Sequence, residues 1–128
     1  MIRITVKRPR VLVVDDDPSI REMLSDFLAM EGYAVETAAD GDEGLRAVEE
    51  SNPSLVVLDM RMPVLDGWGF ARKLRERGIK LPILVVTASQ SPRLWAEEIG
   101  ADGYLAKPFD LVDLLNAIEQ INLSSNAS

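Results

Sequence analysis

Residues 55–59 read LVVLD, a continuous apolar run that ends in a single aspartate. A run of this length without polar alternation is typical of a strand buried on both faces of a parallel sheet. Two similar runs lie elsewhere in the chain: 10–14 (RVLVV) leads into Asp15–Asp17, and 83–86 (ILVV) leads into Thr87. These three runs predict central strands of one sheet, each followed at its carboxyl end by polar side chains.

Apolar residues at helical spacing follow each predicted strand. The helices are predicted to begin near Pro18, Asp40, Gly67, Pro92 and Asp110, and two outer strands are predicted at 34–38 and 104–106. Asp17 and Asp40 are typical N-cap residues, and Gly32 is a typical helix end. Five strands alternating with five helices predict an α/β fold, a doubly wound (βα)5 parallel sheet with the flavodoxin-like strand order 2-1-3-4-5.

The chain of 128 residues is long enough for one compact domain. We predict that this domain spans 10–122, after an N-terminal extension at 1–9. Residues 123–128 are polar and predict a loose tail or the start of a linker.

The composition excludes several kinds of chemistry. The sequence has no cysteine and no histidine, which excludes disulfides, Ser-His-Asp catalysis and the usual zinc sites. A net charge of −7 argues against nucleic acid as a direct partner. No apolar run is long enough to span a membrane, and the basic start lacks the apolar segment of a secretory signal. We therefore expect a cytoplasmic protein that contacts neither nucleic acid nor membrane.

Five polar residues fall at or just beyond the ends of predicted strands: Asp15, Asp16, Asp59, Thr87 and Lys107. In open α/β sheets ligands bind at this edge. Three carboxylates in one crevice repel one another and favour a bound cation, and oxygen ligands without His or Cys favour Mg²⁺. For the aspartates alone, the alternative that DDDP is only a strand end and a helix cap stays open.

The same residues suit phosphoryl transfer. Asp59 is held by a rigid strand, and a carboxylate can attack a phosphoryl group. Thr87 could donate a hydrogen bond to a phosphoryl oxygen, and Lys107 could supply a cation to it. Without a phosphoryl group, we expect Lys107 to pair with Asp59.

Four blocks of sequence resemble the receiver domain of bacterial two-component response regulators, of the chemotaxis-regulator type. They are VLVVDDDPSIRE at 11–22, LVVLDMRMPVLDGW at 55–68, LPILVVTA at 81–88 and GADGYLAKPF at 100–109. The blocks occur in the family's order, and the resemblance covers about residues 10–121.

The resemblance implies a role for each matching residue. Asp59 would be the phosphoacceptor, and Mg²⁺ would be bound by Asp15, Asp16, Asp59 and the backbone carbonyl of Arg61. Thr87 and Lys107 would contact the phosphoryl group. The bond between Lys107 and Pro108 would be cis.

The resemblance also implies how the signal arrives and leaves. Thr87 and Tyr104 would form a switch pair, in which Tyr104 turns inward when Thr87 is drawn toward the phosphoryl group. Arg61 and Ser89 occupy positions that vary in the family and tune the phosphoryl lifetime, so we expect Arg61 to alter hydrolysis. The phosphoryl donor would be a sensor histidine kinase or a histidine phosphotransfer protein. A phosphorylation-dependent homodimer or a downstream protein target is the expected output.

Trp95 lies on the helix predicted to begin near Pro92. We expect it to be a partly buried packing residue, with an anchor for a partner protein as the alternative.

Other functions on a similar fold fit less well. A haloacid-dehalogenase-type phosphatase needs a second aspartate two residues after the acceptor, where this chain has Arg61. A flavodoxin-like binder of FMN would meet repulsion from Asp15–Asp17. A phosphorylation-independent, receiver-like interaction module is the remaining alternative. Such a module is expected to lack the acceptor, the acid pair or the lysine, all of which are present. We therefore expect a signalling phosphoacceptor and not an enzyme, although autophosphorylation from small donors and autodephosphorylation are compatible with the site.

Overall fold

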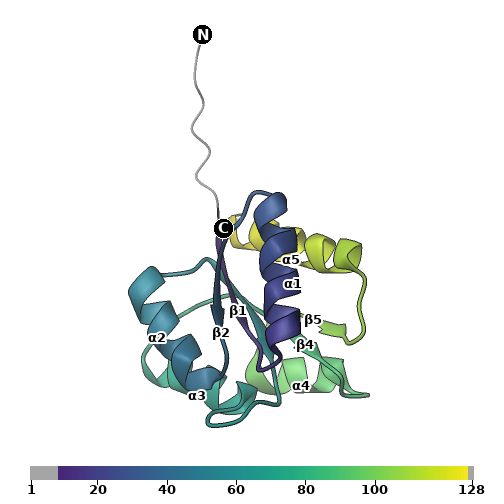
Figure 1. Cartoon of the computed structure of the whole chain (residues 1–128). Helices are drawn as coiled ribbons and strands as arrows, with labels where there is room; N and C mark the ends of the chain where they lie inside the picture. The colour runs from purple at the N-terminus through teal and green to yellow at the C-terminus, as the bar shows by residue number, and fades with distance from the viewer. Residues whose placement is uncertain (1–8, 127–128) are drawn as a thin grey trace.

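The structure is a computed structural model that describes residues 9–126, with side-chain burial described up to residue 122. Strands and helices alternate along the whole described chain (Figure 1). In order, the elements are β1 (Arg10–Val14), α1 (Pro18–Met30), β2 (Ala34–Ala38), α2 (Gly41–Ser51), β3 (Leu55–Asp59), α3 (Gly67–Glu76), β4 (Ile83–Thr87), α4 (Pro92–Ile99), β5 (Gly103–Ala106) and α5 (Leu111–Asn126).

All neighbouring strands are parallel, in the order β2-β1-β3-β4-β5. The predicted fold class and strand order are therefore confirmed. The chain moves outward from β1 to β2 and then returns to the other side of β1 with β3. The carboxyl ends of β1 and β3 thus lie side by side where the winding direction reverses, which is where open α/β sheets bind their ligands.

Helices cover both faces of the sheet, as the uninterrupted apolar strands predicted. On one face α1 and α5 pack through Leu24, Leu28, Leu114 and Ile118 against alternate strand residues such as Val13. On the other face α2, α3 and α4 pack against the intervening strand residues. Their buried residues are Leu45, Val48, Phe70, Ala71, Leu74, Ala96 and Ile99. Because β1, β3 and β4 are buried on both faces, they form a rigid support for whatever follows them.

Helix starts follow the predicted chemistry. The side chain of Asp17 accepts a hydrogen bond from the Ser19 amide, 2.9 Å away, at the start of α1, and Pro18 occupies the first turn. Asp40 accepts from the Glu43 amide at 2.9 Å at the start of α2. These bonds satisfy backbone donors that have no partner within the helix.

The C-terminal end of the last helix differs from the prediction. Helix α5 continues to Asn126, past the predicted boundary at residue 122. Serine and asparagine are only moderately poor helix formers, and the segment contains neither the glycine nor the proline that would stop a helix. Most of the predicted N-terminal extension, residues 1–8, lies outside the described residues.

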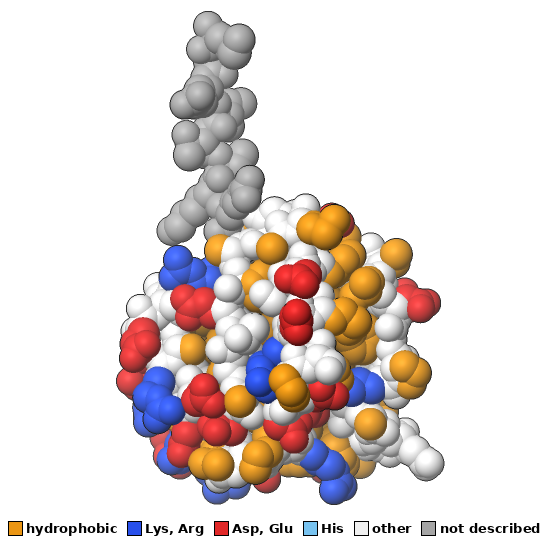
Figure 2. Space-filling view, in the orientation of Figure 1, with side chains coloured by type: hydrophobic (Ala, Val, Ile, Leu, Met, Phe, Trp, Pro, Cys, Tyr) orange, Lys and Arg blue, Asp and Glu red, His pale blue; other side chains and the backbone are white. Residues whose placement is uncertain are grey.

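The surface seen in Figure 2 intersperses acidic and basic side chains, with hydrophobic side chains gathered beside α1. This face shows no continuous basic patch of the kind that binds nucleic acid. None of the helices in the described part of the chain has the length and apolar character of a membrane span.

Candidate functional site

The predicted site residues meet at the carboxyl edge of the sheet. Asp15 and Asp16 follow β1, Asp59 ends β3, Thr87 ends β4 and Lys107 follows β5. The Lys107 amide donates to the Thr87 carbonyl at 2.8 Å, so the polypeptide after β5 remains aligned with the end of β4. The sheet thus brings together groups from four strands that are distant in sequence.

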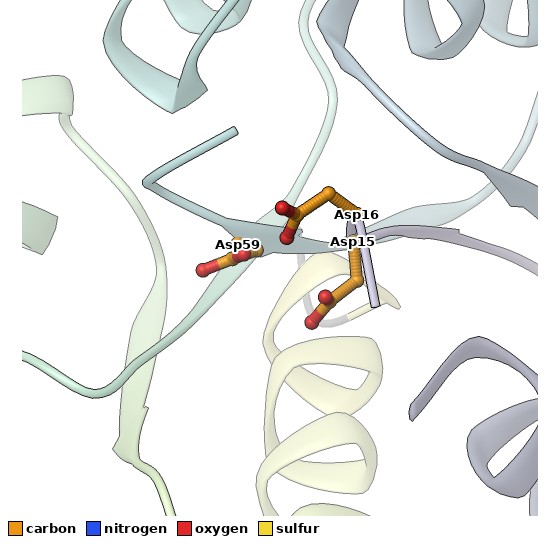
Figure 3. A group of neighbouring side chains, drawn as sticks. All are labelled: Asp15, Asp16 and Asp59. Carbon is orange, nitrogen blue, oxygen red and sulfur yellow. The ribbon is translucent and has the colours of Figure 1, made fainter. Parts of the chain in front are cut away.

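Three carboxylates converge at the ends of β1 and β3 (Figure 3). Asp15, Asp16 and Asp59 each offer an oxygen within 4.8 Å of the others. Asp15 and Asp59 are buried, whereas Asp16 is exposed. This oxygen-only set, open to solvent on one side, has the composition that a hard divalent cation requires.

Lys107 lies between two of these carboxylates. Its Nζ donates a hydrogen bond to Asp15 Oδ2 at 2.8 Å and lies 3.7 Å from Asp59 Oδ1. The expected pairing with Asp59 is therefore present, but the shorter contact is with Asp15. The single positive charge of Lys107 does not balance the three negative charges of Asp15, Asp16 and Asp59. This excess of negative charge favours the binding of a further cation.

The surroundings of Asp59 alter its acidity. Burial raises the pKa of Asp59 from 3.8 to about 6, because the ionised form loses solvation. The charge of Lys107 lowers this pKa, Asp15 and Asp16 raise it, and the backbone amide of Arg61 lowers it. The carboxyl group is therefore ionised at neutral pH, but its ionised form is less favoured than that of an exposed aspartate.

Asp59 opens onto a pocket of about 540 Å³. The pocket is lined by Asp59, Arg61, Thr87, Ala88, Ser89, Gln90, Trp95 and Lys107. Thr87 is buried and its Oγ accepts a hydrogen bond from the Ser89 amide at 3.2 Å. A small anionic group could therefore reach the carboxyl group of Asp59, the hydroxyl of Thr87 and the ammonium of Lys107 together.

Tyr104, the other member of the predicted switch pair, lies on β5 and is 45% exposed. The register pairs it with Val85, two residues before Thr87 in β4. The Lys107–Pro108 peptide bond is cis, as the resemblance implied.

Sequence reasoning missed an aromatic cluster at the pocket mouth. The Arg61 guanidinium lies over the ring of Trp95, with its Cζ 5.1 Å from the ring centroid. Trp95 also meets Trp68 edge to face, with centroids 4.7 Å apart, and Trp68 Nε1 donates to Glu98 at 2.9 Å. The partial burial expected of Trp95 is observed. The sequence carries no signal for the Arg61 contact, because the packing of α4 beside the loop after β3 creates it.

Comparisons with known proteins point to one family. The profile of the response regulator receiver domain matches residues 11–119. Response regulator MprA of Mycobacterium sp. (strain KMS) is 51% identical over 108 residues, which cover 83% of this chain and 47% of that protein. MprA of Mycobacterium leprae is 48% identical over 114 residues, covering 88% of this chain and 50% of that protein. The chain thus spans about half the length of these curated relatives.

Solved structures show the same similarity. The chemotaxis protein CheY4 of Vibrio cholerae superposes with a TM-score of 0.83 at 37% identity, over 90% of this chain and 99% of that one. The response regulator TrrA of Thermotoga maritima, solved in complex with Mg(2+)-BeF, gives 0.79 at 35% identity, over 88% and 98%.

Proposed function

Because this chain belongs to the response regulator receiver domain family, whose members act in two-component signal transduction, we propose that Asp59 is its phosphoacceptor. The observation that carries this proposal is the position of Asp59. It is a buried carboxylate at the end of β3, within 4.8 Å of two further carboxylates and 3.7 Å from Lys107 Nζ. A signalling domain of this kind changes its own covalent state, so it is not a conventional enzyme.

We propose that the metal ion is Mg²⁺, held by Asp15, Asp16, Asp59 and the backbone carbonyl of Arg61. The converging oxygens support this assignment, and so does the Mg(2+)-BeF complex of TrrA. When bound, Mg²⁺ neutralises charge on the transferring phosphoryl group.

The chemistry assigned to the chain is a single displacement. A carboxylate oxygen of Asp59 attacks the phosphorus of a phosphohistidine on a donor protein. The new P–O bond forms as the P–N bond breaks, and the electron pair leaves with the donor imidazole. Lys107 faces the incoming negative charge, and Thr87 donates a hydrogen bond from its hydroxyl to a phosphoryl oxygen. These 128 residues contain no histidine, so the phosphohistidine lies outside them.

The donor is a sensor histidine kinase or a histidine phosphotransfer protein, and the reaction is proposed to take place in the cytoplasm. Small phosphodonors can replace it, and the acyl phosphate is later lost by hydrolysis. Arg61 at the pocket mouth alters the rate of that hydrolysis, which the half-life of the adduct in Arg61→Ala would test. Equal half-lives would contradict the assignment.

The signal leaves through Thr87 and Tyr104. When Thr87 turns toward the phosphoryl group, Tyr104 moves inward and changes the surface of α4, β5 and α5. This surface then binds a downstream protein or a second copy of the domain. Tyr104 is exposed in this structure, so it occupies the outward position from which that movement would start. An unchanged NMR environment of Tyr104 after addition of a phosphoryl mimic would exclude this route.

The decisive experiment is intact-mass analysis after incubation with a small phosphodonor and Mg²⁺. We expect one added phosphoryl group on the native protein, none without Mg²⁺ and none on Asp59→Asn. Asp26→Asn, an exposed change on α1, is the matched control and should accept the group normally. No adduct with the small donor or with a phosphorylated histidine kinase, on a protein that also binds no Mg²⁺, would instead favour the phosphorylation-independent interaction module.

A further inference from the structure

The side chain of Arg61 lies next to the acidic site without pairing with it. Arg61 and Asp59 are two residues apart and line the same pocket. Among the ion pairs of residues 9–122, none includes Arg61. Its guanidinium instead contacts the face of Trp95, 5.1 Å from the ring centroid. A cation at this distance from an indole is attracted by the ring's electrons.

The ring of Trp95 is itself fixed. It belongs to α4 and meets Trp68, from α3, edge to face at 4.7 Å with 62° between the planes. Trp68 is held in turn by its hydrogen bond to Glu98 on α4. Contacts from two helices thus restrict the indole, and with it the place at which it receives the guanidinium.

A mobile guanidinium at this position would be drawn to the carboxylates. In the described part of the chain, Lys107 pairs with Asp15 and Asp59, and Arg21 donates a hydrogen bond to the Asp15 carbonyl. Two cations beside three carboxylates still leave excess negative charge, so the site attracts more positive charge. Arginine pairs with carboxylates through two parallel hydrogen bonds, which occupy the same oxygens that a divalent cation needs. An Arg61 side chain that turned inward would therefore compete with the metal ion.

We propose that Trp95 is a positioning residue, which holds the Arg61 guanidinium at the pocket mouth and so keeps the three carboxylates free for a divalent cation. This inference rests on the proposed metal site. It assigns to α4 a part in metal affinity, although none of its residues belongs to the acidic cluster.

Metal affinity provides the test, because it can be measured without phosphorylation. Mn²⁺ prefers the same oxygen ligands as Mg²⁺, and electron paramagnetic resonance reports the free ion directly. Titrations of Mn²⁺, followed by displacement with Mg²⁺, would compare the native protein with Trp95→Ala, Arg61→Ala and the double variant. We expect Trp95→Ala to weaken binding about 2- to 5-fold, the effect of losing one exposed cation–π contact. Arg61→Ala should bind at least as tightly as the native protein.

The double variant separates positioning from packing. If Trp95 acts through Arg61, Trp95→Ala should have no effect on metal affinity when Arg61 is already alanine. Trp95→Phe keeps an aromatic face and should bind almost as the native protein does. Trp95→Leu keeps apolar bulk without that face, so it should weaken metal binding about as much as Trp95→Ala does. It also keeps the test valid if Trp95→Ala folds poorly. Leu94→Ala, an exposed neighbour on α4, is the matched control and should not change the affinity.

Two results would overturn the inference and leave the proposed function intact. One is native affinity in both Trp95→Ala and Trp95→Leu. The other is an equal loss of affinity whether or not Arg61 is present, which would mean that Trp95 only supports the packing of α3 and α4. Failure of the native protein to bind either ion would overturn the metal site itself, and this inference with it.

Discussion

Replacing Asp59 with asparagine is expected to stabilise the fold at neutral pH while abolishing phosphorylation. The pKa of Asp59 rises from 3.8 to about 6 because the carboxylate is buried and faces Asp15 and Asp16, an effect that Lys107 only partly opposes. A carboxyl group with a raised pKa binds more protons in the folded state than in the unfolded state. Its contribution to stability is therefore fully present below pH 3.8 and is lost as the pH rises through about 6.

The size of the effect follows from that difference in pKa. Between 3.8 and about 6, at ~1.36 kcal/mol per pH unit, ionised Asp59 lowers the free energy of unfolding by about 3 kcal/mol. A neutral amide at this position would carry no charge to desolvate, so Asp59→Asn should raise that free energy by about 2–3 kcal/mol above the folded-state pKa. Asp59 lines a pocket of about 540 Å³ that solvent can enter, so screening lowers the expected gain below the full ~3 kcal/mol.

Urea unfolding followed by circular dichroism, in the presence of EDTA, measures the difference. Near pH 7.5, Asp59→Asn should have a higher midpoint than the native protein at an unchanged slope. Near pH 4 the advantage should fall below about 1 kcal/mol, because native Asp59 is then largely protonated in the folded state. Asp26→Asn should change stability little at either pH. No gain at pH 7.5, or an equal gain at both pH values, would show that the charge of Asp59 does not limit stability.

Two further predictions concern the acidity of Asp59, and a third compares a glycine near the site with one away from it. In metal-free protein, the side-chain carboxyl carbon of Asp59 should titrate by NMR near pH 6, and a midpoint near 3.8 would contradict the effect of burial. In Lys107→Met that midpoint should move upward, because the cation that lowers the pKa is gone; an unchanged midpoint would mean that Lys107 is screened from Asp59. A Cβ at Gly67 would lie 2.5 Å from Met60 Sδ and 2.8 Å from Met60 Cα, so Gly67→Ala should cost about 1–3 kcal/mol in urea unfolding and weaken Mn²⁺ binding. At Gly78 an added Cβ would meet no atom within 4 Å, but the backbone φ of +70° strains any residue with a side chain. Gly78→Ala should therefore lower the free energy of unfolding by about 1 kcal/mol and leave Mn²⁺ binding unchanged.

The fold was predictable because its signals are local. The runs at 10–14, 55–59 and 83–86 are short, rich in β-branched residues and apolar over almost their whole length, which is typical of strands in a sheet covered on both faces. Prolines, glycines and capping aspartates marked the helix ends. The prediction was wrong only where such a marker is absent, as at the end of α5, which continues to Asn126.

The meeting of Asp15, Asp16, Asp59, Thr87 and Lys107 was also predictable, because parallel strands place their carboxyl ends at one edge. The roles assigned to these residues stay predictions. Their placement required only the order of the strands and the position of each residue relative to a strand end.

The sequence by itself thus determined the sheet, its covered faces and the set of side chains at its carboxyl edge, since hydrophobic pattern and chain direction are properties of neighbouring residues. Only the tertiary structure decided that Lys107 donates its hydrogen bond to Asp15, that burial raises the pKa of Asp59, and that Trp95 receives the guanidinium of Arg61. These three features depend on distances of a few ångströms between groups far apart in the chain. Such distances are set by how helices and strands pack against one another, which no local pattern of residues specifies.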